Sequence, residues 1–162
     1  MTAQHHRLLF ICTGNICRSP IAEVIAIRRG EEIGVPIDAR SAGTLGIENA
    51  PADPQMVAVA SELGLDLSKH QSQEITDDLI AWADYVLCME MAHVSHVREF
   101  YQDAGENTLL LGNFGGTMDI RDPHGSWFRV TYRKSRDEIA RCVHRFVDGV
   151  AGASRSTHLK SR

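Results

Sequence analysis

The sequence predicts an α/β fold in which a parallel sheet is covered by helices on both faces. Short apolar runs typical of buried strands alternate with segments whose apolar residues recur at helical spacing. The 162 residues also have an ordinary globular composition, 43% hydrophobic and 23% charged, with no repeat and no evident linker. Strands that alternate with helices are joined by right-handed crossovers, which make a sheet parallel. We therefore expect one domain over residues 1–162.

Four short apolar segments are the expected strands. They are residues 8–12, 37–43, 84–89 and 108–111. The first runs directly into turn residues, and the second stops at Gly43, as buried strands bounded by turn signals do.

Cap residues followed by proline mark the starts of the first two helices. Ser19-Pro20 and Asp53-Pro54 both fit an N-cap with proline at the first helical position. We expect the first helix to reach about Gly30 and the second to end at Gly64.

The remaining helices follow from their apolar spacing. Thr76 is the expected cap of a short helix within 75–83, a further helix covers about 91–101, and the last spans about 131–149. Residues 112–127 read as a glycine-rich loop. The tail, residues 150–162, has no acidic residue and little apolar content, so we expect it to be mobile.

Composition argues against several classes of function. The net charge of −4 gives no reason to expect nucleic-acid binding or attraction to a membrane. No apolar run is long enough for membrane insertion, and "MTAQHHRLLF" lacks the features of a signal peptide, so we expect the protein in the cytoplasm. Four cysteines are too few for a disulfide scaffold, which favours catalytic or redox roles for them.

The stretch "CTGNICRSP", residues 12–20, predicts a phosphate-binding loop directly after the first strand. Ligands bind beyond the carboxyl ends of parallel strands, and a helix N-terminus offers unpaired N–H groups there. Gly14 and Asn15 tolerate left-handed backbone angles, so the loop can curl with its N–H groups inward. The planar guanidinium of Arg18 can then hold two phosphate oxygens. The expected substrate-binding residues of the loop are Thr13, Gly14, Asn15, Ile16, Cys17 and Ser19.

The same positive environment would stabilise a thiolate, so we expect Cys12 to have a lowered pKa and to act as a nucleophile. Ser19 is placed to donate a hydrogen bond to that thiolate when it leaves. Asp122, in "RDPHG", could serve as general acid in a first step and as base toward water in a second. Taken singly, a cysteine at a strand end is usually a buried hydrophobe and Asp-Pro is usually a turn. Their combination with arginine and serine at one strand–helix junction favours catalysis.

The chain resembles the low-molecular-weight protein tyrosine phosphatase family. The resemblance lies in "CTGNICRSPIAE", "SAGT", "DPQMVAVASELGLDLSKHQSQ", "ADYVLCM", "DPHG" and "YRKSRDEIARCV", in family order over most of residues 7–149. It implies a three-layer fold with a four-stranded parallel sheet, and hydrolysis without a metal or cofactor through a phosphocysteine on Cys12. It also implies that Arg18 binds the phosphate and that Asp122 is the general acid. A family hydrogen-bond network that holds the loop matches Asn15, Ser19, Ser41 and His70.

Two positions bear on the substrate. Related protein-arginine phosphatases carry threonine where this chain has Ile16, and an apolar residue there favours a phenyl ring over a guanidinium. Many relatives also place an aromatic residue after "SAGT" and another after Asp-Pro, where this chain has "LGIENA" and His124. One aromatic wall is therefore missing or supplied differently. Trp127 or Phe128 either folds back over the site or anchors its loop.

Two other functions remain as alternatives. Related arsenate reductases share the cysteine loop but pass electrons through further thiols, for which Cys88 is the candidate here. A phosphopeptide-binding module without turnover is the other. Cys17 is either a buried thiol or a partner that protects Cys12 as a disulfide under oxidant. By family analogy, the substrate is a tyrosine-phosphorylated protein, such as a bacterial tyrosine kinase of polysaccharide export or, with secretion that needs no signal peptide, a host protein.

Several further side chains are expected to have no role in the site. His93 and His96 read as solvated rather than metal-binding, and His5 and His6 as a frayed start. Cys142 reads as core. The solvent-facing side of the last helix is expected to carry Arg133, Arg136, Arg141 and Arg145.

Overall fold

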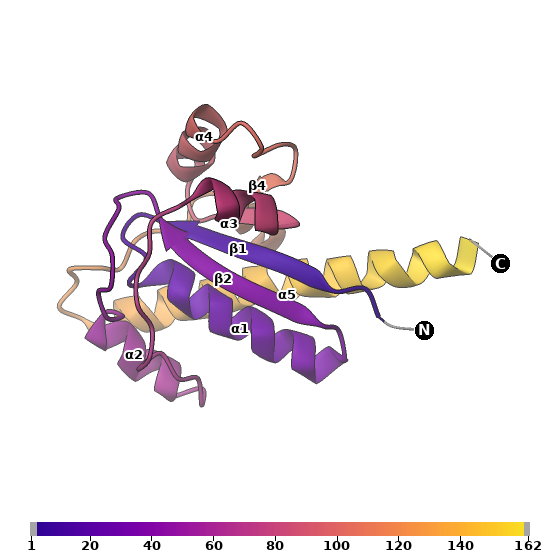
Figure 1. Ribbon diagram of the computed structural model, residues 1–162. Coiled ribbons are helices and arrows are strands. Elements are labelled where there is room, and N and C mark those ends of the chain that lie inside the picture. Colours follow the sequence, from indigo (N-terminus) through magenta and orange to yellow (C-terminus); the bar gives the residue numbers. More distant parts are fainter. Residues whose placement is uncertain (1–2, 161–162) are drawn as a thin grey trace.

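A computed structural model describes residues 3–160, with side chains described through residue 156. Its strands form one parallel sheet in the order β2-β1-β3-β4 (Figure 1). The strands are β1 (His6–Cys12), β2 (Ile37–Gly43), β3 (Tyr85–Cys88) and β4 (Thr108–Leu110). The α/β class, the four strands and their parallel direction are confirmed.

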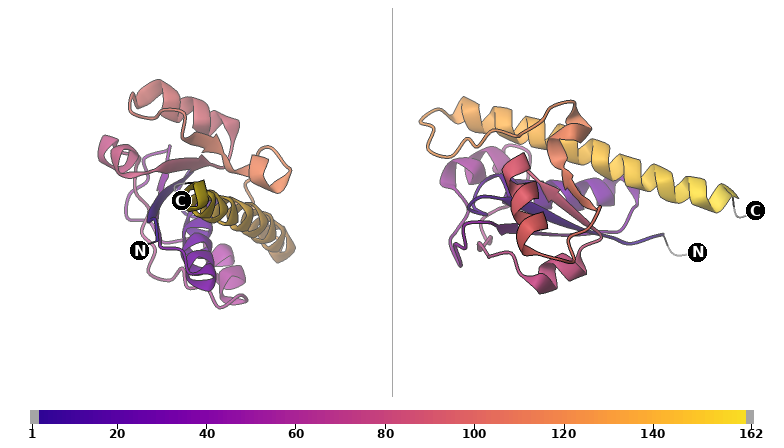
Figure 2. Two further views of the ribbon diagram at one scale, coloured as in Figure 1. Left: turned by 90° about the vertical axis from the view of Figure 1, so that its right-hand side faces the viewer. Right: turned by 90° about the horizontal axis from the view of Figure 1, so that it is seen from above.

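Helices cover both faces of the sheet. On one face lie α1 (Arg18–Ile33) and α5 (Arg129–Lys160), with α2 (Pro54–Ser61) packed on α5. On the other lie α3 (Asp77–Trp82) and α4 (Met91–Phe100), as the left view of Figure 2 shows. A short 3₁₀ helix, η1 (Leu111–Gly115), follows β4, so the predicted glycine-rich loop begins as a helical turn.

The strand β1 is buried on both faces, which explains its unbroken apolar run. Leu8, Phe10 and Cys12 belong to the core cluster beneath α1 and α5, whereas Leu9 and Ile11 belong to the cluster beneath α3 and α4. This alternation follows from the two-residue period of a strand. It places the Cys12 side chain on the α1 side of the sheet, at the carboxyl end of β1.

The caps Asp53 and Thr76 are confirmed, because their side chains accept hydrogen bonds from the backbone N–H groups of Gln55 and Leu79. The predicted start of the first helix was wrong by two residues. The helix α1 begins at Arg18 with Cys17 as N-cap, so Ser19 lies inside the first turn and is not its cap. The helix ends past Gly30, at Ile33, and the left-handed backbone of Gly34 (φ 69°) caps its last turn.

The final helix is longer than predicted. It continues past residue 149 to Lys160, as helix where we expected a mobile tail, and Figure 1 shows its end extending beyond the sheet. Ala151 is buried, and the Ser154 hydroxyl lies 3.2 Å from Oε1 of Gln4 and 3.4 Å from Nε2 of His6. These contacts also correct the frayed start, because His6 is a buried member of β1.

Arg136 is buried rather than solvent-facing. Its Nη1 donates to the carbonyl of Val59 and to Glu62, both at 2.8 Å, which fastens α2 to α5. Arg133 also binds Glu62, and Cys142 lies in the core as predicted. No helix within residues 3–160 combines the length and apolar character needed to cross a membrane.

Two helical glycines give a matched test of this packing. A Cβ at Gly30 in α1 would lie 2.6 Å from Cγ1 of Ile37 and 2.7 Å from the carbonyl oxygen of Val35, whereas one at Gly149 in α5 would meet nothing within 4 Å. We expect Gly30→Ala to lower the free energy of unfolding by about 1–3 kcal/mol through overpacking. Gly149→Ala should raise it by about 0.5–1 kcal/mol, because alanine favours helix. Urea unfolding measures both, and equal stability of the two variants would contradict the packing described here.

Candidate active site

The loop between β1 and α1 is built around Asn15, a fully buried residue with left-handed backbone (φ 54°). The Asn15 carbonyl accepts a hydrogen bond from Nε2 of His70 at 2.6 Å, and its Oδ1 accepts from the backbone N–H of Gln73 at 2.9 Å. Its Nδ2 donates to Oγ of Ser19 at 2.8 Å. Burial lowers the pKa of His70, which keeps the ring neutral with Nε2 as donor. Three contacts therefore fix the left-handed backbone expected at Asn15, whereas Gly14 does not adopt that conformation.

Ser19 connects Asn15 to the sulfur of Cys12, which lies 2.9 Å from its hydroxyl oxygen. Because the amide of Asn15 already donates to that oxygen, the Ser19 proton is free to point at the sulfur. Cys12 is only 2% exposed and lines a cavity of about 150 Å³ at the carboxyl end of β1.

The end of β2 approaches this loop closely. The N–H groups of Thr44 and Leu45 donate to the carbonyls of Cys12 and Thr13 at 3.1 and 3.0 Å. A Cβ at Gly43 would lie 2.7 Å from the Thr13 carbonyl oxygen, so this position requires glycine.

Ser41 differs from its expected place in the loop network. Its hydroxyl donates to Oε2 of Glu23 at 2.6 Å, which joins β2 to α1, and burial raises the pKa of that carboxyl. Ser41 reaches the loop through Gln73, whose side-chain amide donates to the Ser41 carbonyl at 2.9 Å while its backbone N–H binds Asn15.

Arg18 is buried, with 1% of its side chain exposed, and both of its terminal nitrogens have partners. Nη1 donates to Glu90 and to the carbonyl of Ile120, the latter at 2.7 Å, while Nη2 lies 3.4 Å from Oδ2 of Asp122. Sequence reasoning missed Glu90. The available signal was its position directly after the predicted strand at 84–89, because site residues gather at the carboxyl ends of parallel strands.

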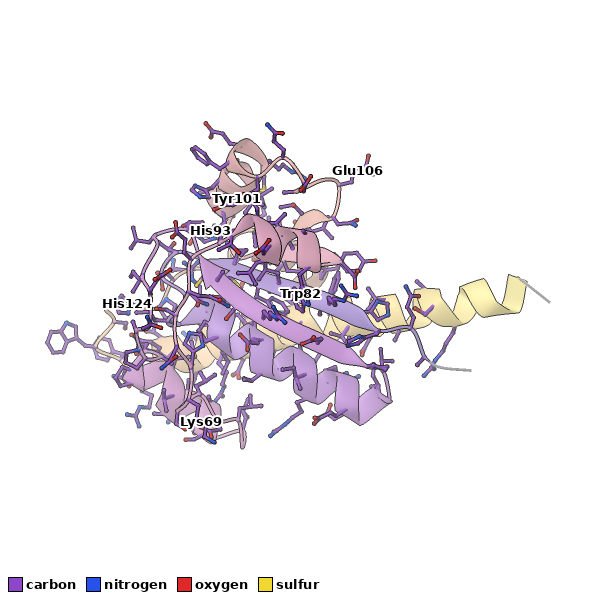
Figure 3. The ribbon with its side chains drawn as sticks, viewed as in Figure 1. Lys69, Trp82, His93, Tyr101, Glu106 and His124 are labelled. Atoms are coloured by element: carbon purple, nitrogen blue, oxygen red, sulfur yellow. The ribbon has the colours of Figure 1, made fainter. Side chains whose placement is uncertain are left out.

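His93 is buried in the site, which corrects its expected solvation. Its Nδ1 accepts from the backbone N–H of Glu90 at 3.1 Å, so in the neutral ring Nε2 carries the proton and donates to Oγ1 of Thr13 at 2.9 Å. Burial and the neighbouring charge of Arg18 lower the pKa of His93 to about 4, which keeps the ring neutral near pH 7. Figure 3 shows His93 and His124 at the same end of the sheet, where β1 and β2 terminate.

Asp122 and the aliphatic walls complete the cavity. Asp122 is 42% exposed and lines it together with Cys12 and Arg18. The walls that lie where an aromatic residue was expected are Leu45, Ile47 and the ring of His124, with Ile16 beside them. Neither expected role of the two aromatics holds, because Trp127 is 92% and Phe128 is 70% exposed, so they neither cover the cavity nor anchor the loop.

The other thiols differ in their relation to Cys12. Cys17 lines the same cavity and is buried, and this burial raises its pKa. Cys88 lies in the core cluster beneath α3 and α4, on the opposite face of the sheet from Cys12, and burial raises its pKa to about 12. All four cysteines are free thiols.

Comparison with known proteins matches this architecture. A family model described as low molecular weight phosphotyrosine protein phosphatase matches residues 7–156. A protein-arginine-phosphatase of Geobacillus stearothermophilus is 34% identical over 88% of this chain and 95% of its own length. The low molecular weight protein-tyrosine-phosphatase Etp of Escherichia coli is 34% identical over 80% of each chain.

Solved structures of the same family superimpose on this chain. The crystal structure of a low molecular weight protein tyrosine phosphatase from T. tengcongensis superimposes with a TM-score of 0.84 at 31% identity, covering 89% of this chain and 99% of that one. Fold, loop and sequence thus lead to the same conclusion: the chain belongs to the low molecular weight phosphotyrosine protein phosphatase family.

Proposed function

We propose that this protein is a protein tyrosine phosphatase that hydrolyses phosphotyrosine through a phosphocysteine on Cys12. The observation that carries the proposal is the meeting of three groups in one cavity. They are the sulfur of Cys12, the guanidinium of Arg18 and the carboxyl of Asp122. Family membership supports the reaction class.

In the first step, the Cys12 thiolate attacks phosphorus while the bond from phosphorus to the phenolic oxygen breaks. Arg18 and the inward N–H groups of the loop bind the non-bridging oxygens as charge develops on them. Asp122, in its protonated form, gives its proton to the departing oxygen. Glu90 and the Ile120 carbonyl hold Arg18 in place before substrate arrives, so little reorganisation is needed.

In the second step, water attacks the phosphocysteine and the S–P bond breaks. The Asp122 carboxylate now accepts a proton from that water. The sulfur leaves as a thiolate, and the Ser19 hydroxyl at 2.9 Å donates a hydrogen bond to it. Inorganic phosphate is released and Asp122 is protonated again.

The cavity walls favour an aryl ester. Ile16, Leu45 and Ile47 offer aliphatic surface for a phenyl ring and no polar partner for a guanidinium. We further propose a tyrosine-phosphorylated protein as substrate, with a bacterial tyrosine kinase or a host protein as candidates. A reducing cytoplasm would keep the nucleophilic thiol active.

The first test is removal of the nucleophile. Cys12→Ser should lower turnover of an aryl phosphate by roughly 10⁴-fold or more while phosphate still binds, because Arg18 and the loop remain. Cys88→Ala is the control, since Cys88 lies across the sheet and should be dispensable for ester hydrolysis. Retained turnover in Cys12→Ser would exclude the mechanism. Arsenate reduction that needs Cys88 would instead support a reductase.

The second test concerns the proton donor. Asp122→Ala should lower kcat/KM for esters of weakly acidic phenols by about 10²–10³-fold and for esters of acidic phenols much less. Asp119→Ala, three residues earlier, should keep the wild-type dependence, since that carboxylate accepts from the N–H of Met91 at 2.8 Å outside the cavity. Equal losses for all esters in Asp122→Ala would show that another group donates the proton.

The third test concerns specificity. Ile16→Thr places a hydroxyl in the cavity wall and should shift the ratio of phosphoarginine to phosphotyrosine turnover upward by roughly tenfold. Ile16→Val keeps the apolar wall and should leave the ratio unchanged. Parallel assays with both substrates measure the ratio, and no shift in Ile16→Thr would mean that Ile16 does not select the substrate.

A further inference from the structure

Asp53 has a buried carboxylate that takes no part in the reaction described above. This carboxylate binds three different segments of the chain. Its Oδ1 accepts from the N–H of Gln55 at 2.8 Å and so caps α2. Its Oδ2 accepts from Nδ1 of His124 at 2.7 Å and from the hydroxyl of Tyr132 at 3.0 Å. Asp53 is only 6% exposed, so each of these donors offsets part of the cost of burying it.

The chemistry of the groups decides which atoms donate to Asp53. An ionised carboxylate can only accept, so Nδ1 of His124 carries the hydrogen in this pair. Burial, with the hydrogen bond to Asp53, raises the pKa of Tyr132 to about 12. Tyr132 therefore keeps its proton near neutral pH.

His124 links Asp53 to the proposed general acid. Its backbone N–H donates to Oδ1 of Asp122 at 3.0 Å, with Pro123 between the two residues. Its ring also lines the cavity that holds Cys12. One residue thus contacts Asp122 through its backbone and Asp53 through its side chain.

Asp53 is also fixed to the phosphate-binding loop. Its backbone N–H donates to the carbonyl of Ile16 at 2.7 Å. Inside the loop at 121–128, the N–H of Ser126 donates to the Pro123 carbonyl and the N–H of Phe128 to the Ser126 hydroxyl. Besides that of His124, other contacts reach outside the loop: Asp122 lies 3.4 Å from Nη2 of Arg18, and the backbone of Gly125 binds Tyr132. The Asp53–His124 contact therefore joins the loop of Asp122 to the phosphate-binding loop at a second place, in addition to the pair of Asp122 with Arg18.

We propose that Asp53 and His124 are positioning residues that hold Asp122 where it can protonate the leaving oxygen. The proposal rests on the proposed function and adds to it the residue pair that controls proton donation. The pair acts through Asp122, since the ring of His124 donates to Asp53 and its backbone holds the acid.

The test uses two substitutions of the partly exposed His124, whose side chain is 55% exposed. His124→Ala removes the donor to Asp53. His124→Asn is the matched variant, because its Nδ2 occupies the place of the ring Nδ1 and can still donate. We expect His124→Ala to lower kcat/KM about 10- to 100-fold for esters of weakly acidic phenols and little for esters of acidic phenols. His124→Asn should recover most of the loss.

A double-variant cycle separates positioning from a general effect. In an Asp122→Ala background, His124→Ala should add no further dependence on leaving-group acidity, because both changes affect the same proton. An equal loss for every ester in His124→Ala, or an additive leaving-group effect in the double variant, would overturn the proposal.

Hydrogen exchange of the amides at 121–128 gives a readout independent of turnover. Exchange there should accelerate in His124→Ala and in Asp53→Asn but not in His124→Asn. If the wild type hydrolyses no phosphate ester, the proposed function fails, and the exchange result still decides whether the pair holds the loop. Unchanged exchange in His124→Ala would overturn the positioning role even if the phosphatase activity stands.

Discussion

The curl of the chain at Asn15 is the constraint on which the rest of the site depends. Left-handed backbone at a non-glycine residue costs on the order of 1 kcal/mol or more. Three hydrogen bonds, from His70, from Gln73 and to Ser19, each contribute roughly 1 kcal/mol and together exceed that cost. The curl turns the loop around the sulfur of Cys12 and starts α1 at Arg18. Without it, neither the sulfur nor the guanidinium would face the cavity.

The second constraint on the site is the burial of the charged guanidinium of Arg18. Arg18 is almost wholly removed from water, and its charge is balanced by Glu90, the Ile120 carbonyl and Asp122. Nη1 is held by the first two, while Nη2 faces Asp122 and is, in the proposed mechanism, the nitrogen that donates to a phosphate oxygen. His93 supports the same side of the site as a neutral donor to Thr13. The proposal thus divides structural support and phosphate binding between the two terminal nitrogens of one guanidinium.

Beyond Cys12 and Arg18, the cavity walls include aliphatic side chains. Leu45 and Ile47 come from the segment after β2, and Ile16 comes from the loop itself. In the proposed function, selectivity comes from the shape of these walls and their lack of polar partners, whereas the reaction depends on Cys12, Arg18 and Asp122. Asp122, the proposed acid, lies on a separate loop, and Asp53 contacts both that loop and the phosphate-binding loop.

The sequence by itself determined what depends on near neighbours in the chain. Each such feature involves residues only a few positions apart. These features are the strand and helix periodicity, the caps at Asp53 and Thr76, and the spacing of Cys12, Arg18 and Ser19. Only the tertiary structure decided the partners Glu90, His93 and Asp53, the burial of Arg136, and the continuation of α5 beyond residue 149. These partners lie many residues apart in the chain, 72 in the case of Arg18 and Glu90. Their contacts and burial are set by how the elements pack, and a local pattern carries no record of which distant side chain will be buried beside it.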